Sequence, residues 1–458
     1  MSISLRVNLR YNGTYRPAAI GYVNSAKQVS EVVKIGHESD LGYNVVARSG
    51  GHSYIAGGLG GKNGSIVIDL YSLAILDYEV APAIAHMGTG FKLGTIAGSL
   101  DDWGRALPHG TCAYVGWGGH ISYGGYGFTT RNWGLTLDTM ISAQIVLANG
   151  TIATASQDQN PDLFFAIRGA APSFGIVTQT TVQTLPKLSS ATVYQYGWNL
   201  NVAAATSALD VYQQYSLTAT IPKELGIEVV LAPGDTRGTV SFMVLGAWYG
   251  AANTFNATIK PLLDKLPKPL WTTFDVGDYR NSLKNLAGGS IDTFEPNGHD
   301  TFYANCKSLI TPKNAPLTAQ AERAFITYLT NQGFDTDLGW FLQIGLIGDK
   351  NSAVAAVPAG ETAFPHRNAL FIWQLYGYTQ GNKPPFPSSG FTFIGGIADS
   401  VVKSMAAGWD YGAYTNYIDD RLQDGQQLYY KQNLPRLKEL KKKYDPTRVF
   451  DFPTAIKP

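Results

Sequence analysis

Cysteine is scarce in this sequence. Cys112 and Cys306 are the only two among 458 residues, so at most one disulfide can form. A disulfide-stabilised scaffold is therefore excluded. Charge of one sign is also missing, since 35 Lys and Arg nearly balance 34 Asp and Glu to give a formal net charge of +1. That balance gives no support to nucleic-acid binding.

Several functional signatures are absent as well. No run of about 18 apolar residues predicts a membrane span, and the seven histidines lack metal-ligand spacing, so we expect no metal. The dinucleotide motif G-x-G-x-x-G, the P-loop, H-E-x-x-H and G-x-S-x-G do not occur, which argues against a Rossmann site, a P-loop NTPase, a zincin and an α/β-hydrolase. No signal peptide is evident, but four Asn-x-Ser/Thr sequons, at Asn12, Asn63, Asn149 and Asn256, favour a secreted protein.

Glycine and aromatic residues are abundant instead. Residues 42–134 hold 21 of the 50 glycines, and aromatic residues make up 12% of the chain. Two glycine-rich runs, Arg48–Tyr54 and His109–Phe128, each contain a nucleophile, His52 in the first and Cys112 in the second. Glycine lets the backbone approach a flat or anionic group closely. The two runs therefore indicate a site for a bulky ligand.

The length of the chain predicts more than one domain. Strand and helix signals alternate up to about Lys187, and strands typical of an antiparallel sheet begin near Thr192. After Tyr411 the pattern returns to that of the first part, with a helix predicted over residues 423–444. We therefore expect one domain built from residues 1–190 and 411–458, with a second domain, residues 191–410, inserted into it.

The two glycine-rich runs, together with segments that include residues 162–177, 339–376 and 414–450, resemble the FAD-linked oxidases of the vanillyl-alcohol oxidase superfamily. Within it, the berberine-bridge-like group and the fungal oligosaccharide oxidases with doubly attached flavin are most similar. The resemblance covers nearly the whole chain. It implies an α+β fold with a two-domain FAD-binding architecture (PCMH/VAO-type), in which the inserted substrate domain is a large antiparallel sheet covered by helices.

The same resemblance implies FAD as cofactor, bonded covalently to His52 and Cys112. The backbone N–H groups of Ser49 to Ser53 would hold the pyrophosphate as an anion-binding nest. Asp138 and Ile176 match cofactor-lining positions, although a strand-end carboxylate and a core isoleucine would explain them equally well. The full set of implied cofactor residues is Arg48, Ser49, Gly50, Gly51, His52, Ser53, Cys112, Val115, Gly118, Gly119, Gly124, Gly125, Asp138 and Ile176.

Catalysis by such an enzyme needs a base, because the substrate hydroxyl loses its proton while the neighbouring carbon gives hydride to the flavin. Tyr417 matches the tyrosine base of the oligosaccharide oxidases. Its ordinary pKa of about 10 requires that the pKa be lowered or that the proton be passed on. Tyr54, Gln343 and Gln374 match substrate-contacting positions.

The sequence departs from that pattern at two carboxylates. The relatives have a base-supporting aspartate two residues after the glutamine matched by Gln343, where this chain has Gly345. A sugar-recognising glutamate is expected to be replaced by Val230. Both changes predict a more apolar pocket and leave Tyr417 without its expected partner.

Three functions follow as hypotheses. The first is a monomeric, secreted oxidase that converts the reducing-end C1 hydroxyl of an oligosaccharide to a lactone and reduces O2 to H2O2. The second keeps the flavin but acts on an apolar alcohol or secondary metabolite, as an oxidase or oxidative cyclase. The third is a flavin-fold scaffold or pericyclase without redox turnover, which the presence of His52, Cys112 and Tyr417 disfavours.

Overall fold

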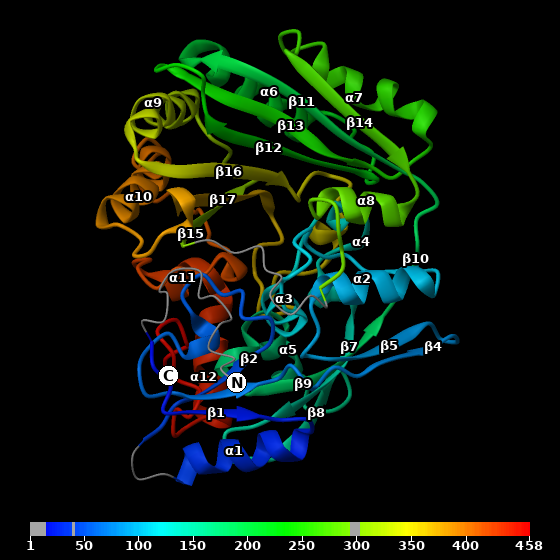
Figure 1. Ribbon diagram of the computed structural model, residues 1–458, viewed down its shortest axis with the longest axis vertical. Helices are drawn as coiled ribbons and strands as arrows, with labels where there is room; N and C mark the ends of the chain where they lie inside the picture. The colour runs from blue at the N-terminus through cyan, green and yellow to red at the C-terminus, as the bar shows by residue number, and fades with distance from the viewer. Residues whose placement is uncertain (1–14, 39–41, 294–302) are drawn as a thin grey trace.

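The protein has two stacked halves in the computed structural model, which describes residues 15–38, 42–293 and 303–458 (Figure 1). The upper half is built on one seven-stranded antiparallel sheet, and the lower half holds a three-stranded and a five-stranded sheet. The predicted fold class, α+β with a large antiparallel sheet covered by helices, is confirmed.

The three-stranded sheet delivers the first glycine-rich run. Its parallel strands lie in the order β1 (Ala19–Tyr22), β3 (Ile66–Asp69) and β2 (Val45–Arg48). β3 is buried along its whole length, as expected for an apolar parallel strand covered on both faces. Helix α1 (Ala26–Glu38) packs on this sheet. Because β2 ends at Arg48, the residues that follow start at the edge of a rigid element.

The five-stranded sheet has the order β4 (Leu76–Glu79), β5 (Ile84–Gly88), β9 (Ile176–Gln183), β7 (Met140–Val146) and β8 (Ile152–Ser156). Gly150, at φ +81°, allows the tight Asn149-Gly150 turn between β7 and β8. Helices α2 (Leu93–Asp102), α3 (Trp117–Tyr123) and α5 (Pro161–Ala170) pack with this sheet in one core. Helix α3 thereby holds the second glycine-rich run beside the first.

The seven-stranded sheet is formed by residues 191–379. Its strands, in spatial order, are β14 (Trp271–Gly277), β11 (Ala191–Asn201), β13 (Thr239–Trp248), β12 (Leu225–Pro233), β16 (Leu338–Leu346), β17 (Ala369–Thr379) and β15 (Ala304–Pro312). Helices α6 (Val202–Thr218), α9 (Ala319–Asp335) and α10 (Ser388–Val402) pack against it in a second core. Strands β12, β16 and β17 face the lower half with side chains that line the candidate site.

The predicted helix over residues 423–444 is wrong as a single element. The chain instead forms α11 (Gly425–Tyr430) and α12 (Leu434–Tyr444). Lys431 adopts φ +47°, which ends α11, and Pro435 is tolerated in the first turn of α12. The break lets Tyr429 and Tyr430 pack into the lower core.

Helix α10 starts at Ser388 directly after Pro387, which is its N-cap residue. Within the described ranges no helix is long and apolar enough to cross a membrane. No cluster of three His, Cys, Asp or Glu side chains able to hold a metal ion occurs among those residues either.

Candidate active site

A cavity of about 470 Å³ is lined by residues of both halves. This volume lies within the range of small-molecule and cofactor sites. The lower half contributes both glycine-rich runs, and the upper half contributes residues of β12, β16 and β17. The short segment from Tyr414 to Ile418, which follows the inserted sheet in sequence, closes the lining.

The two glycine-rich runs touch each other through their backbones. A Cβ atom on Gly50 would lie 2.5 Å from the Gly116 nitrogen, and one on Gly116 would lie 2.1 Å from the Gly50 nitrogen. Ser49 fixes the contact, because its Oγ accepts a hydrogen bond from the Gly118 N–H (3.2 Å) and donates one to the Thr89 carbonyl (2.5 Å). Any side chain at these two glycines would push the runs apart.

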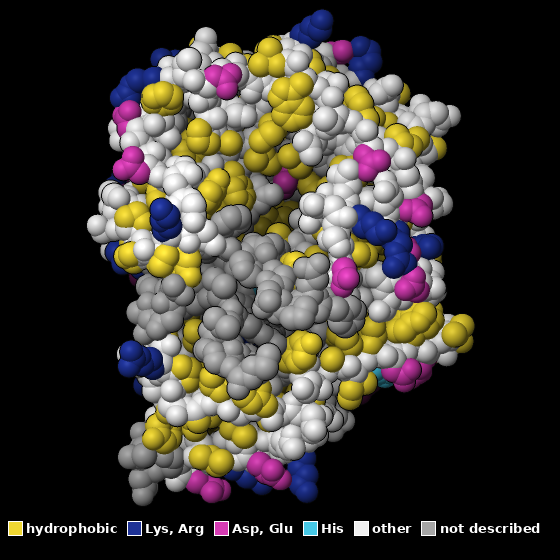
Figure 2. Space-filling model, in the orientation of Figure 1, with side chains coloured by type: hydrophobic (Ala, Val, Ile, Leu, Met, Phe, Trp, Pro, Cys, Tyr) yellow, Lys and Arg dark blue, Asp and Glu magenta, His cyan; other side chains and the backbone are white. Residues whose placement is uncertain are grey.

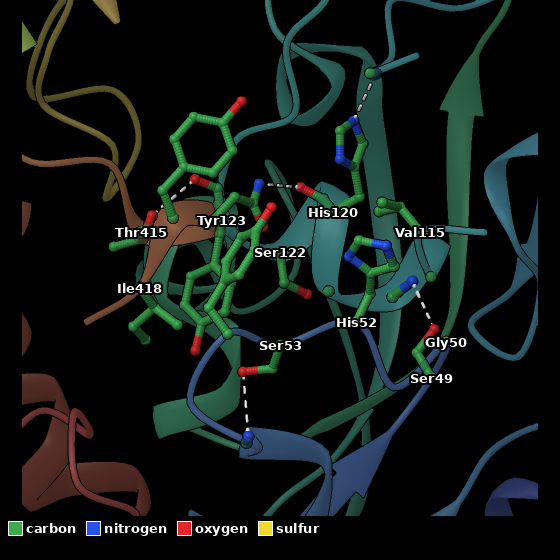
Figure 3. Close-up of a pocket in the computed structure, with 18 of the residues that line it drawn as sticks. Ser49, Gly50, His52, Ser53, Val115, His120, Ser122, Tyr123, Thr415 and Ile418 are labelled. Carbon is green, nitrogen blue, oxygen red and sulfur yellow. Dashed lines mark hydrogen bonds between the residues drawn. The ribbon is translucent and has the colours of Figure 1, made fainter. Parts of the chain in front are cut away.

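His52 and Cys112 line the same cavity although 60 positions separate them in the chain. Cys112 is exposed, whereas Cys306, the other cysteine, is buried. In Figure 3, His52 lies with Val115 and His120 on one side of the cavity, and Tyr123, Thr415 and Ile418 lie on the other. One ligand can therefore be reached by an imidazole and a thiol from two separate loops.

His120 is a site residue to which the sequence assigned no role. Burial, with smaller contributions from His109 and His52, lowers its pKa to about 3, so the ring is neutral. Its Nε2 accepts a hydrogen bond from the Gly110 N–H (3.2 Å), and its carbonyl accepts one from Asn416 (3.1 Å). His120 thus connects, through hydrogen bonds, the glycine-rich run that contains Cys112 with the C-terminal segment that contains Tyr417.

Tyr417 belongs to a cluster of tyrosines at the cavity wall. Its hydroxyl lies 2.8 Å from the hydroxyl of Tyr126, and its ring meets those of Tyr54 and Tyr414 edge-on. Burial and the neighbouring phenols raise the pKa of Tyr417 well above 10. A neutral phenol that accepts a proton must pass its own on, so a tyrosine base at this position would need a partner that takes its proton.

The predicted substrate-contacting residues converge on this wall. Tyr54, Gln343 and Gln374 all line the cavity. The Gln374 amide donates a hydrogen bond to the Tyr54 hydroxyl (2.8 Å), although the two residues are 320 positions apart. Gln343 and Gln374 face each other in the register of β16 and β17. Their amides provide hydrogen-bond donors and acceptors on the side of the upper sheet.

The expectation that this pocket has lost its glutamate is wrong. Val230 does not line the cavity, but Glu228, two residues earlier on β12, does. The Glu228 carboxylate accepts a hydrogen bond from the Gln343 amide (3.0 Å), and burial raises its pKa to about 7. Because side chains alternate along a strand, residues 228 and 230 point to the same side, and only the local position decides which one reaches the cavity.

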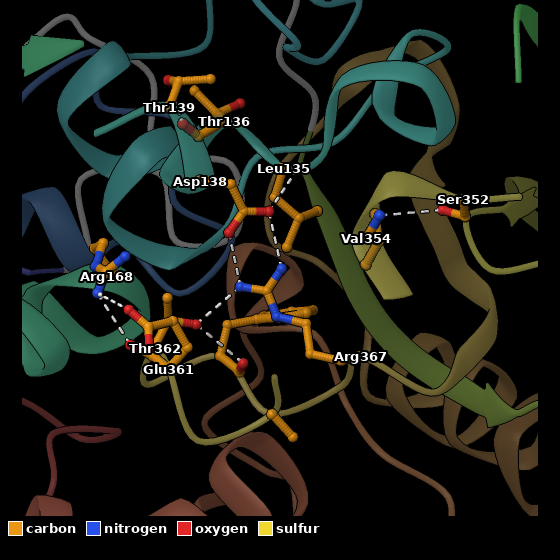
Figure 4. A network of polar contacts seen from close by, with 12 residues as sticks. Leu135, Thr136, Asp138, Thr139, Arg168, Ser352, Val354, Glu361, Thr362 and Arg367 are labelled. Atoms are coloured by element: carbon orange, nitrogen blue, oxygen red, sulfur yellow. Dashed lines mark hydrogen bonds and ion pairs between the residues drawn. The ribbon is translucent and has the colours of Figure 1, made fainter. Parts of the chain in front are cut away.

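Three predicted cofactor residues lie outside the cavity lining. Asp138 forms a bidentate ion pair with Arg367 (both contacts 2.8 Å) and accepts a hydrogen bond from the Leu135 N–H (Figure 4). Gly124 and Gly125 pack behind the site, and the Gly125 N–H donates to the Tyr414 hydroxyl (2.8 Å). These residues support the wall of the cavity from outside, as the alternative of a structural carboxylate for Asp138 anticipated.

The remaining predicted residues line the cavity. They are Arg48, Ser49, Gly50, Gly51, Ser53, Val115, Gly118, Gly119 and Ile176. A Cβ atom on Gly119 would meet no heavy atom within 4 Å, so this face of α3 opens onto free space. Since the space is bordered by backbone on one side and by His52 and Cys112 on others, the residues present fit FAD.

Known proteins of similar sequence support that cofactor. Residues 17–156 match the model of the FAD binding domain family, and residues 413–457 match the family described as berberine and berberine like. A carbohydrate oxidase of Microdochium nivale is 34% identical over 97% of this chain and 88% of its own length. The cofactor of this chain is FAD.

Solved structures agree with the fold along its whole length. A chitooligosaccharide oxidase is 31% identical and superposes with a TM-score of 0.91, covering 100% of this chain and 96% of its own. The glucooligosaccharide oxidase of Acremonium strictum, described with a 6-S-cysteinyl, 8α-N1-histidyl FAD, is 31% identical with a TM-score of 0.89, covering 100% and 96%. The chain therefore belongs to the family of FAD-linked, berberine-like oxidases that contains these carbohydrate and oligosaccharide oxidases.

Proposed function

We propose that this protein oxidises the C1 hydroxyl of the reducing end of an oligosaccharide to a lactone and reduces O2 to H2O2. The observation that carries the proposal is the meeting of His52, Cys112 and Tyr417 at one cavity. Bound FAD supplies the acceptor for the hydride and then the electrons for O2. The relatives named above support the sugar as substrate class.

His52 and Cys112 are proposed to hold the cofactor covalently, as in the glucooligosaccharide oxidase. A ring nitrogen of His52 and the sulfur of Cys112 would each bond the isoalloxazine. Such bonds would withdraw electron density and raise the reduction potential of the flavin. Two attachments would also hold the cofactor while a bulky substrate binds.

Tyr417 is proposed to take the proton of the C1 hydroxyl while the C1–H bond breaks. Tyr54, Gln374 and Gln343 are polar groups on the same wall, and hydrogen bonds to the sugar hydroxyls would orient C1 towards the flavin. The rings of Phe341 and Tyr376, stacked at 4.8 Å between centroids, border the site and would pack against an apolar face of the sugar.

A second candidate function is favoured by Gly345 and by the aromatic lining. An oxidase acting on an apolar alcohol or secondary metabolite needs fewer charged groups than a sugar oxidase, and Glu228 has the only carboxyl group among the described residues that line the cavity.

We propose in either case a monomer that is secreted. Asn63, Asn149 and Asn256, three of the sequon asparagines, are exposed and support glycosylation.

One panel tests these proposals. Purified protein is supplied with cellobiose, xylobiose, lactose, chitobiose and simple aromatic or aliphatic alcohols, and H2O2 release is measured. Release with the sugars and not with the alcohols supports the oligosaccharide oxidase. Release with the alcohols alone would favour the second function. Yellow protein whose flavin survives acid precipitation supports covalent attachment.

A further inference from the structure

Glu228 and Gly345 face each other across neighbouring strands at the cavity. They are paired in the antiparallel register of β12 and β16, two positions from the pair Val230 and Gln343. A Cβ atom on Gly345 would lie 3.9 Å from Glu228 Oε2 and 3.4 Å from Tyr126 Cε2. The Glu228 carboxyl and the Tyr126 ring therefore border the same small space, which the missing side chain at position 345 leaves free.

Tyr126 connects that space to Tyr417. The two hydroxyls are hydrogen-bonded at 2.8 Å, and both residues line the cavity. Burial raises the pKa of both phenols well above 10, and the negative charge of Glu228 raises the pKa of Tyr126 further. A proton taken by this pair near neutral pH must therefore move on to another group.

We propose that Glu228 accepts the proton that leaves the substrate hydroxyl, in a relay through Tyr417 and Tyr126. The substrate O–H bond breaks as Tyr417 oxygen takes that proton, and Tyr417 gives its own proton to Tyr126. Tyr126 in turn gives its proton to the Glu228 carboxylate, directly or through one water molecule in the space over Gly345. No atom is gained or lost, and the carboxyl releases its proton to solvent between turnovers.

The surroundings of Glu228 suit this role. Gln343 on β16 donates to the carboxylate and stabilises its charged form, while burial raises its pKa to about 7. The negative charge of Glu228 contributes to the raised pKa of two described side chains, Tyr126 on the cavity side and Tyr212 of α6. A carboxylate with a pKa near the working pH is a more effective proton acceptor than one with an ordinary pKa of about 4.3.

The inference rests on the proposed oxidase function, and its test separates the two. The experiment uses holoenzyme and follows the rate of flavin reduction by stopped-flow absorbance between pH 5 and 9, with the best substrate of the panel. Wild-type rates should rise with pH around 7 as Glu228 ionises. Glu228→Gln should lower the rate at pH 8 by about 100-fold, a typical contribution of a general base, and should abolish that rise.

Rescue from the opposite strand provides the matched control. A Cβ atom at Gly345 would meet its nearest neighbours at 3.4 to 3.9 Å, which are ordinary van der Waals contacts. Gly345→Asp in the Glu228→Gln background should therefore restore at least one tenth of the wild-type rate, because it places a carboxylate beside Tyr126 again. Gly345→Asn, which fills the same space without an ionisable group, should restore nothing. Equal rescue by Asn, or an unchanged rate and pH profile in Glu228→Gln, would overturn the proposal.

A measurement without substrate covers the case in which neither sugars nor alcohols reduce the flavin. Infrared spectra of resting holoenzyme should show a carboxyl group that titrates near pH 7 in the wild type and is missing in Glu228→Gln. Tyr126→Phe should raise the midpoint of that titration, because in the proposed relay the Tyr126 hydroxyl donates to the carboxylate, directly or through one water molecule, and phenylalanine cannot. If the pH midpoint of the carboxyl titration is the same in Tyr126→Phe and the wild type, the relay is refuted, whatever the substrate is.

Discussion

The hydroxyl of Tyr417 lies 2.8 Å from that of Tyr126, so two phenols that are 291 positions apart in the chain share one hydrogen bond at the wall of the cavity. Tyr126 comes from the second glycine-rich run and Tyr417 from the segment after the inserted sheet. The pair therefore forms only when both parts of the lower half are assembled, and it lines the same cavity as His52 and Cys112, the predicted attachment residues.

Substitution of Tyr417 tests its role as base. Tyr417→Phe keeps the ring and its packing against Tyr54 and Tyr414 but removes the hydroxyl. The rate of flavin reduction should fall by about 10²- to 10⁴-fold, with flavin content and thermal stability close to those of the wild type. Tyr411→Phe, a partly buried tyrosine outside the cavity, is the control and should leave the rate unchanged. An unaltered reduction rate in Tyr417→Phe would remove it as the base.

The two attachment residues make separate predictions. Cys112→Ala and His52→Ala should each retain flavin after denaturation, because the other bond remains, and the double variant should lose it. Flavin fluorescence in a denaturing gel and the mass of the flavinylated peptides measure this. Cys306→Ala is the matched cysteine control, since that thiol is buried and should carry no flavin. Flavin lost from both single variants would contradict two independent bonds.

Asp138 should act on stability rather than on flavin chemistry. Its carboxylate pairs with Arg367, whose side chain is 4% exposed, so Asp138→Asn leaves a buried guanidinium without its counter-charge. The loss in free energy of unfolding should be about 3–5 kcal/mol, seen as a lower midpoint of thermal unfolding. Asp335→Asn breaks the ion pair with Arg237, in which both side chains are about half exposed, and should cost less than about 1 kcal/mol. Similar losses in the two variants would show that burial is not the cause.

Glu322 should make stability depend on pH. Burial, and then the charge of Asp210, raises its pKa to about 8, above the ordinary value of about 4.3 that it has in the unfolded chain. The folded state therefore holds a proton that the unfolded state releases, and stability is lost as pH rises from about 4.3 towards 8. Glu322→Gln mimics the protonated form and keeps the contact with Gln213.

Thermal unfolding at pH 5 and pH 8 measures this effect. The variant should match the wild type most closely at the lower pH and exceed it at pH 8, because only the wild type must bury a charge there. Glu439→Gln, at an exposed position of α12, is the control and should change stability little at either pH. An equal effect of Glu322→Gln at both values would rule out titration of this residue.

Much of the site could be predicted from the sequence because its signals are local. Glycines at close backbone contacts, a histidine and a cysteine within those runs, and a tyrosine in a recognisable segment all lie in short stretches. One error arose where the answer depended on a shift of two residues along a strand, because the glutamate was expected to be replaced by Val230, whereas Glu228 lines the cavity. The match of Asp138 to a cofactor-lining position stays a prediction, since its carboxylate lies outside the cavity lining and pairs with Arg367.

The sequence by itself indicated the chemistry of the site, because two nucleophiles within glycine-rich runs predict a binding site for a bulky ligand. It also determined that position 345 is a glycine and has no carboxylate. Only the tertiary structure decided which side chain lies opposite Gly345, and that residue is Glu228. Glu228 and Gln343 meet across a separation of 115 residues. Such a contact depends on strand register, which is fixed by the packing of whole strands in a sheet and leaves no signature in either segment alone.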